Sequence, residues 1–78
     1  MNDINQRVTA CFANIFPDLR PEEIPLASAA TLATWDSVAQ VTLLASIAEE
    51  FGIELEMSDF DELVSYPLIV EFLAQKLK

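Results

Sequence analysis

Apolar residues recur at helical spacing in three stretches of the chain. Within residues 3–16 they lie three or four positions apart, which predicts an amphipathic helix that Pro17 ends. Residues 37–51 show a similar period between Asp36, a favourable N-cap residue, and Gly52, a favourable C-cap residue. Ser65 predicts the start of a last helix with Pro67 in its first turn, and its inward apolar residues are expected to be Leu68, Ile69, Phe72, Leu73 and Leu77.

The segments between these helices predict the rest of the fold. Three prolines prevent a continuous helix in residues 17–36, so we expect a long loop held to the core by Leu32 and Trp35. Residues 53–57 alternate like a strand, but no second strand exists to pair with them, so we expect an extended connector. Ser58 and Asp61 have capping-box spacing and predict a short helix over residues 59–64. The prediction is one all-α domain over residues 1–78, with three main helices and a short one.

The predicted second helix has two apolar arcs. The first is expected to face the core and contains Leu43, Leu44, Ile47 and Phe51. The second lies roughly 130° around the helix by the same spacing and contains Val38, Val41, Ala45 and Ala48. Such a second arc is typical of a helix-recognition surface. The alternative is a central helix that the bundle covers on two sides.

Charge and composition exclude several functions. The 78 residues have a net charge of −9, and no Lys or Arg occurs between Pro21 and Gln75, so nucleic acids and anionic membranes would be repelled. The negative field either steers basic partners or only keeps the chain soluble. With no His and a single cysteine, Cys11, expected in the core, the chain lacks a Cys/His dyad and a zinc site. The spacing after Asp59 does not fit a calcium loop.

Location and size also yield expectations. The first residues lack a basic and then apolar leader pattern, and no apolar run is long enough to cross a membrane. We therefore expect a cytoplasmic protein. A domain this small has a thin core, which favours a binding or carrying module over a self-contained enzyme.

Two motifs resemble the acyl carrier proteins. They are Thr34-Trp35-Asp36-Ser37-Val38 at the start of the second predicted helix and Ala48-Glu49-Glu50-Phe51-Gly52-Ile53 at its end. The resemblance covers essentially the whole chain and implies that a phosphopantetheinyl transferase attaches 4′-phosphopantetheine from coenzyme A to Ser37. It also implies that Asp36 helps to bind the transferase and its metal, and that the arm holds a cargo as a thioester. No metal ligands of the chain's own are predicted.

Departures from the family pattern bear on partner choice. Trp35 and Val38 replace the residues usual beside Asp-Ser, and positions that are typically acidic in the second helix are Ala39, Thr42 and Ala48. Because complementary charge guides partner choice, we hypothesise a specialised monomeric carrier that serves acyl-loading and acyl-transfer enzymes with basic docking surfaces. The expected contact residues are Val38, Val41, Ala45, Ala48 and Glu49. The alternatives are a peptidyl or aminoacyl carrier, and a helical interaction module whose Ser37 is never modified.

Overall fold

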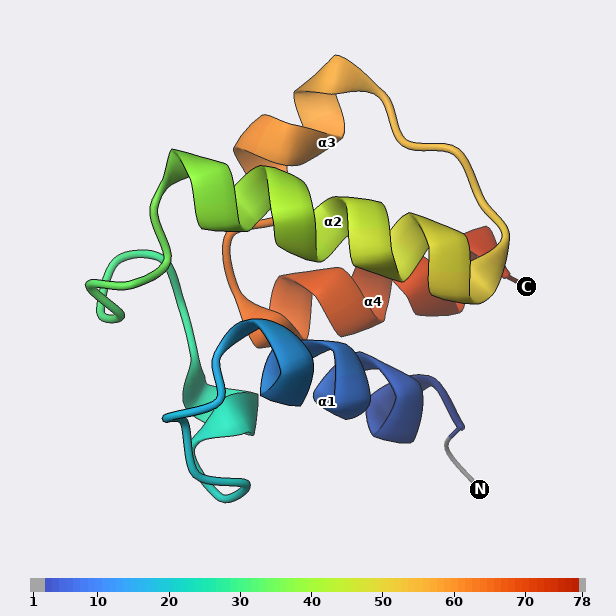
Figure 1. Ribbon diagram of the computed structural model, residues 1–78. Coiled ribbons are helices and arrows are strands. Elements are labelled where there is room, and N and C mark those ends of the chain that lie inside the picture. Colours follow the sequence, from blue (N-terminus) through green and yellow to red (C-terminus); the bar gives the residue numbers. More distant parts are fainter. Residues whose placement is uncertain (1–2, 78) are drawn as a thin grey trace.

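The computed structural model describes residues 3–77, and four α-helices surround one core in this part of the chain (Figure 1). They are α1 (Asp3–Ile15), α2 (Ser37–Phe51), α3 (Met57–Glu62) and α4 (Tyr66–Lys76). A 3-10 helix, η1 (Ile24–Leu26), lies in the loop after α1. No strand occurs among the described residues, although Ser28 and Ser65 form an isolated antiparallel bridge. The predicted all-α bundle, with three main helices and a short one, is confirmed.

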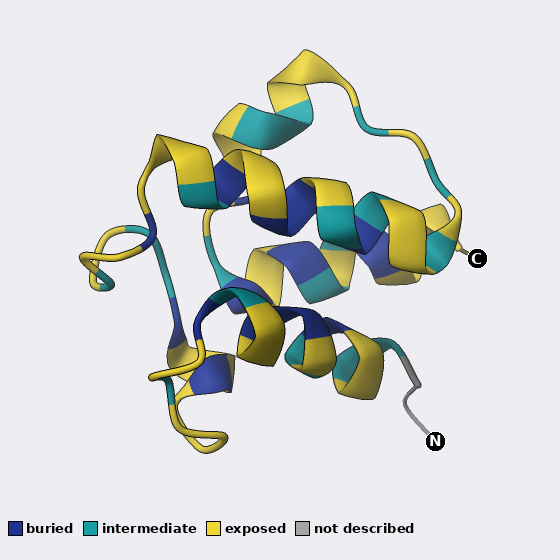
Figure 2. Ribbon diagram, viewed as in Figure 1, coloured by how far each residue is buried: buried dark blue, intermediate teal, exposed yellow. Residues whose placement is uncertain are grey.

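The core lies between α1, α2 and α4, as the buried positions in Figure 2 show. The largest fully buried side chains outside the loop come from these three helices: Val8, Phe12, Leu43, Leu44, Ile47, Ile69 and Leu73. The predicted core face of the second helix is confirmed for Leu43, Leu44 and Ile47. Phe51 is only half-buried, and the Arg7 guanidinium carbon lies 4.2 Å from its ring centroid. None of the helices in residues 3–77 is long and apolar enough to cross a membrane.

Helix α4 begins where Ser65 predicted, because the Ser65 hydroxyl accepts a hydrogen bond of 3.3 Å from the Leu68 N–H. Its buried face contains Tyr66, Ile69 and Leu73. Ile69 and Leu73 follow Tyr66 by three and seven residues, which places all three on one side of the helix. The expectation that Leu68 and Leu77 face the core is wrong, since each is 43% exposed. Leu68 is one residue from the buried row and therefore points about 100° away from it. Leu77 follows the last residue of the helix.

The loop between α1 and α2 packs more deeply than its prolines suggest. Ile24 in η1, Ala27 and Trp35 are buried at 1%, 5% and 4% exposure. Leu32 is half-buried against the same core, so both expected contacts of the loop are confirmed. Backbone hydrogen bonds from Ala29 N to Val64 O and from Tyr66 N to Ala27 O join this loop to the start of α4. The loop is therefore part of the core structure.

Residues 53–56 after α2 form an extended connector, as predicted, but Met57, which was also expected there, is the first residue of α3. The predicted bounds of this short helix are wrong, because it spans Met57–Glu62 and not residues 59–64. Its N-cap is Glu56, whose N–H donates to the Asp59 carboxylate at 2.9 Å, in place of the predicted Ser58 and Asp61 pair. Several acidic residues with cap spacing follow one another here, and the helix ends before Leu63, which is buried at 6% exposure.

Candidate functional site

Ser37 is the first residue of α2, and the chain before it determines how it is presented. Asp36 has an extended backbone, and its carboxylate accepts a hydrogen bond of 2.9 Å from the Ala39 N–H. The Asp36 carbonyl accepts the first intrahelical bond, from the Gln40 N–H, at 2.8 Å. The predicted N-cap role of Asp36 is therefore confirmed, and the Ser37 side chain is exposed at the helix start.

A buried polar network lies directly beneath this helix start. The Trp35 indole N–H donates to the Gln40 side-chain oxygen. The Gln40 amide nitrogen in turn donates to the Phe60 carbonyl at 2.9 Å and to the Leu63 carbonyl at 2.8 Å. One side chain, 8% exposed, therefore connects the loop, the first turn of α2 and the end of α3.

Sequence reasoning missed Gln40, although a signal for it exists. Gln40 precedes Leu43, Leu44 and Ile47 by three, four and seven residues, so helical periodicity places it on the core face. A polar side chain on a core face is expected to find buried partners. The sequence does not say which partners, because they are backbone groups about twenty residues away along the chain.

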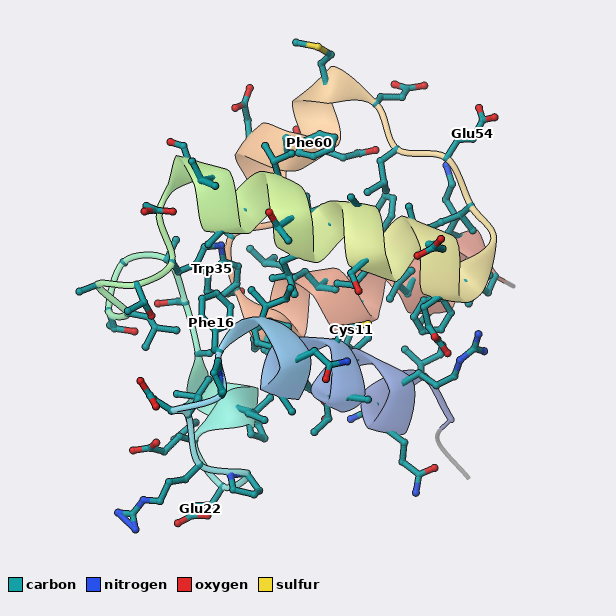
Figure 3. The ribbon with its side chains drawn as sticks, viewed as in Figure 1. Cys11, Phe16, Glu22, Trp35, Glu54 and Phe60 are labelled. Atoms are coloured by element: carbon teal, nitrogen blue, oxygen red, sulfur yellow. The ribbon has the colours of Figure 1, made fainter. Side chains whose placement is uncertain are left out.

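An open hollow of about 450 Å³ lies beside Ser37. Its walls come from the loop, the first two turns of α2 and α3 with the residues after it. Its lining residues are Ala29, Trp35, Asp36, Ser37, Gln40, Val41, Phe60, Asp61 and Val64. Figure 3 shows Trp35 below the start of α2 and Phe60 on the α3 side of the same helix. The hollow is partly apolar, its charged groups are two carboxylates, and Ser37 stands at its edge.

The predicted second arc of α2 divides into an exposed part and a half-buried part. Val38 and Val41 are 74% and 55% exposed, and Ala45 is also exposed. Glu49 is exposed at the far end of the helix, whereas Ala48 is half-buried. The bundle therefore leaves Val38, Val41 and Ala45 uncovered. They begin one residue after Ser37 and continue along the same helix.

The chemistry available to the site follows from its side chains. Burial raises the pKa of the Cys11 thiol, which is 5% exposed in the core as predicted, so this sulfur is a poor nucleophile at neutral pH. No group of three His, Cys, Asp or Glu residues that could hold a metal occurs in the described part of the chain. Ser37 has no histidine that could act as its general base.

The start of α2 fits a phosphopantetheine arm. The Ser37 and Val38 N–H groups precede the first intrahelical hydrogen bond, and neither has a partner among the hydrogen bonds of the described residues. Free N–H groups and the positive end of a helix dipole favour an anion such as a phosphodiester. The hollow next to the hydroxyl offers space for the part of the arm beyond the phosphate.

Comparison with known proteins shows which family the chain belongs to. A family model described as phosphopantetheine attachment site matches residues 6–73, which include Asp36, Ser37 and all of α2 and α3. No curated protein and no solved structure shows a significant match to the chain. Domains of the matched family bear a covalently attached 4′-phosphopantetheine and act as carriers.

Proposed function

The chain belongs to the family of phosphopantetheine attachment domains, and we propose that Ser37 is the residue to which its 4′-phosphopantetheine is attached. The observation that supports this most strongly is the exposed Ser37 hydroxyl at the first position of a helix whose start Asp36 caps. Other hydroxyls fit less well. The Ser65 hydroxyl is half-buried and caps α4, and exposed Ser58 lies inside a helix of six residues.

The proposed attachment is a phosphoryl transfer from coenzyme A. The Ser37 Oγ attacks the phosphorus nearer the pantetheine, and a new P–O bond forms as the P–O bond to adenosine 3′,5′-bisphosphate breaks. The serine proton passes to a base of the transferase, because this chain places no histidine near Ser37. The Ser37 and Val38 N–H groups then lie next to the new phosphodiester. Once attached, the arm supplies a terminal thiol that holds a cargo as a thioester.

We propose that partner enzymes bind the exposed face of α2, which consists of Val38, Val41, Ala45, the half-buried Ala48 and Glu49. The exposure of the two valines supports this role, because neither side chain is buried in the bundle and an exposed apolar patch is typical of an interaction site. The partners would combine an apolar patch with basic residues at its edge, because no Lys or Arg occurs from residue 21 to residue 75. Acyl-loading and acyl-transfer enzymes of a specialised lipid or polyketide pathway fit this description, with the carrier acting as a cytoplasmic monomer.

Intact mass after incubation with coenzyme A and a broad-specificity phosphopantetheinyl transferase tests the attachment site. The wild type and a Ser58→Ala control are expected to gain one phosphopantetheine, whereas Ser37→Ala is expected to gain none. Circular dichroism would establish that all three proteins are folded. Modification of Ser37→Ala, or no modification of the wild type by several transferases, would contradict the proposal and favour an unmodified interaction module.

The same transferase provides a first test of the docking face. Val41→Asp places a carboxylate in the middle of the exposed face and is expected to lower kcat/KM for modification about tenfold, mainly through KM. Leu26→Asp is the matched control, because Leu26 is an 80% exposed apolar residue in η1, outside α2, and the change in charge is the same. Equal effects of the two substitutions would show that net charge matters and the α2 face does not.

A further inference from the structure

The end of the core nearest Ser37 is filled by aromatic rings. Trp35, two residues before Ser37, packs edge-on against Phe12 with ring centroids 5.4 Å apart, and its centroid lies 5.7 Å from that of Phe16. Tyr66 also packs against Phe12, with ring centroids 5.4 Å apart. All four rings are at most 5% exposed. Trp35 also forms part of the wall between this cluster and the hollow beside Ser37.

The Gln40 network holds Trp35 in this position. The indole N–H donates to Gln40, and Gln40 also binds the Phe60 and Leu63 carbonyls at the end of α3. A group that entered the core past Trp35 would have to displace the indole ring. That displacement would leave a buried N–H donor and the Gln40 oxygen without partners, which opposes entry.

An aliphatic cargo gains free energy for each methylene that it removes from water. A long chain would therefore enter the protein interior if space next to its arm were present or cheaply opened. Interiors are close-packed, and adding methylenes to a filled core is destabilising. A second surface hollow, of about 420 Å³, shares none of its lining residues with the first and does not include Ser37. The hollow that Ser37 lines is the open one outside Trp35.

We propose that Trp35 determines the cargo class of this carrier by closing the core beside Ser37, so that the protein takes short acyl groups held in the open hollow and excludes long aliphatic chains from its interior. This inference rests on the proposed attachment at Ser37. It makes Trp35 a specificity-determining residue and gives a physical reason for a tryptophan immediately before Asp-Ser. A smaller residue at position 35 would open interior space directly below the start of the arm.

The test compares loaded carriers that differ only in cargo length and in residue 35. A broad-specificity transferase attaches the arm to Ser37 from coenzyme A whose thiol bears either an acetyl or a decanoyl group. Intact mass establishes that each protein is loaded. Because a failure of loading is visible in the mass, a failure of the attachment proposal is distinguishable from a failure of the cargo proposal. The readout is the melting temperature of each loaded protein.

In the wild type, decanoyl and acetyl carriers are expected to melt at the same temperature. In Trp35→Leu, the decanoyl chain fills the space that the ring leaves and is expected to raise the melting temperature by about 5 °C over the acetyl form. Trp35→Phe retains more of the ring, keeps the test valid if the leucine variant does not fold, and should give a smaller rise. Leu73→Ala is the control, because it opens a cavity in the later half of α4, away from Ser37 (Figure 1). No rise is expected there.

Fluorescence of the wild type gives an independent readout, because Trp35 is the single tryptophan of the chain. A cargo held outside the core leaves the ring buried against Phe12 and Phe16, so its emission does not move to longer wavelength between the acetyl and decanoyl forms. The proposal is overturned if the decanoyl chain stabilises the wild type as much as Trp35→Leu, or if it moves the Trp35 emission to longer wavelength, as displacement of the ring into water would. It is equally overturned if the chain stabilises Leu73→Ala as much as Trp35→Leu.

Discussion

The two long connections of this bundle are attached to it in different ways. The first, residues 16–36, places Ile24, Ala27 and Trp35 in the core and forms backbone hydrogen bonds to the start of α4. The second, residues 52–62, contains the connector and α3, and α3 has no buried residue. Its contacts with the bundle come from three half-buried residues, Ile53, Leu55 and Phe60, from buried Leu63 just after α3, and from the hydrogen bonds that Gln40 donates.

This difference predicts which of the two connections opens locally. Segments with few buried apolar contacts open at low free energy, whereas core segments open only with global unfolding. The first connection looks like a loop in the sequence but should exchange its amide protons as slowly as the main helices. The second should open locally. Ser37 lies between them, with Trp35, which is buried in the core, on one side and α3, which we expect to open more readily, on the other.

The largest expected effect comes from removing buried volume in the first connection. Ile24→Ala should lower the free energy of unfolding by about 2–5 kcal/mol, because Ile24 is 1% exposed. That loss is a large part of the roughly 4–12 kcal/mol expected for a domain of this size. Phe60→Ala in the second connection should cost less and should increase amide exchange chiefly in α3. Urea unfolding and hydrogen exchange measure both, and equal global losses would remove the distinction between the connections.

The next effect tests the link between the two connections. Gln40→Leu keeps the approximate size of the side chain but leaves the Trp35 N–H and the Phe60 and Leu63 carbonyls without their partner. We expect a loss of about 1–3 kcal/mol, faster exchange in α3, and a shifted indole N–H resonance. Gln75→Leu, at an exposed position of α4, is the control and should change none of these. An unshifted indole resonance in Gln40→Leu would mean that the hydrogen bond does not form in solution.

The sequence predicts the first of these connections less well than the helices beside it. The bounds of α1, α2 and α4 follow from apolar periodicity and from local end signals at Pro17, Asp36, Gly52 and Ser65. The 3-10 turn at Ile24–Leu26 depends on contacts with α1 and α4, which no local pattern contains. Leu26 is apolar like Ile24 but lies outside the core.

The register of α3 escaped prediction for a different reason. Glu56, Ser58, Asp59 and Asp61 offer several cap pairs at equivalent spacing, so local preference does not choose between them. In the structure Glu56 and Asp59 form the cap, and Leu63, just after the helix, is buried. The same long-range approach of α3 creates the Gln40 hydrogen bonds and the hollow beside Ser37. The position of Ser37 itself could be predicted, because a helix start is a local feature.

A smaller loss of stability is expected from substitution of Gly52, at the start of the second connection. Gly52 has φ of 63°, in the left-handed region, and its N–H binds the carbonyls of the last turn of α2. Gly52→Ala should cost about 1 kcal/mol, and because a Cβ would meet nothing within 4 Å, the cost is one of backbone conformation. Gly52→Asn should lose less, since asparagine tolerates this conformation better. Equal losses in urea unfolding would point to a cause other than φ.

The smallest effect concerns charge. Residues 49–62 contain seven carboxylates. Arg7 forms an ion pair with one of them, since its Nε lies 2.8 Å from the Glu50 carboxylate. Repulsion within this segment should lower the melting temperature at low ionic strength, and added salt should raise it by screening. Arg7→Gln should increase that salt dependence.

The first connection supplies the control. The Arg20 guanidinium Nη1 lies 3.7 Å from the Glu22 carboxylate. Both side chains are highly exposed, and ion pairs at such positions contribute little to stability. Arg20→Gln changes the net charge as much as Arg7→Gln does but leaves the acidic segment as it was. A greater salt dependence in Arg7→Gln alone would assign the repulsion to residues 49–62, which are the end of α2 and the second connection. An equal increase in both variants would assign it to total charge, because position along the chain would then have no influence.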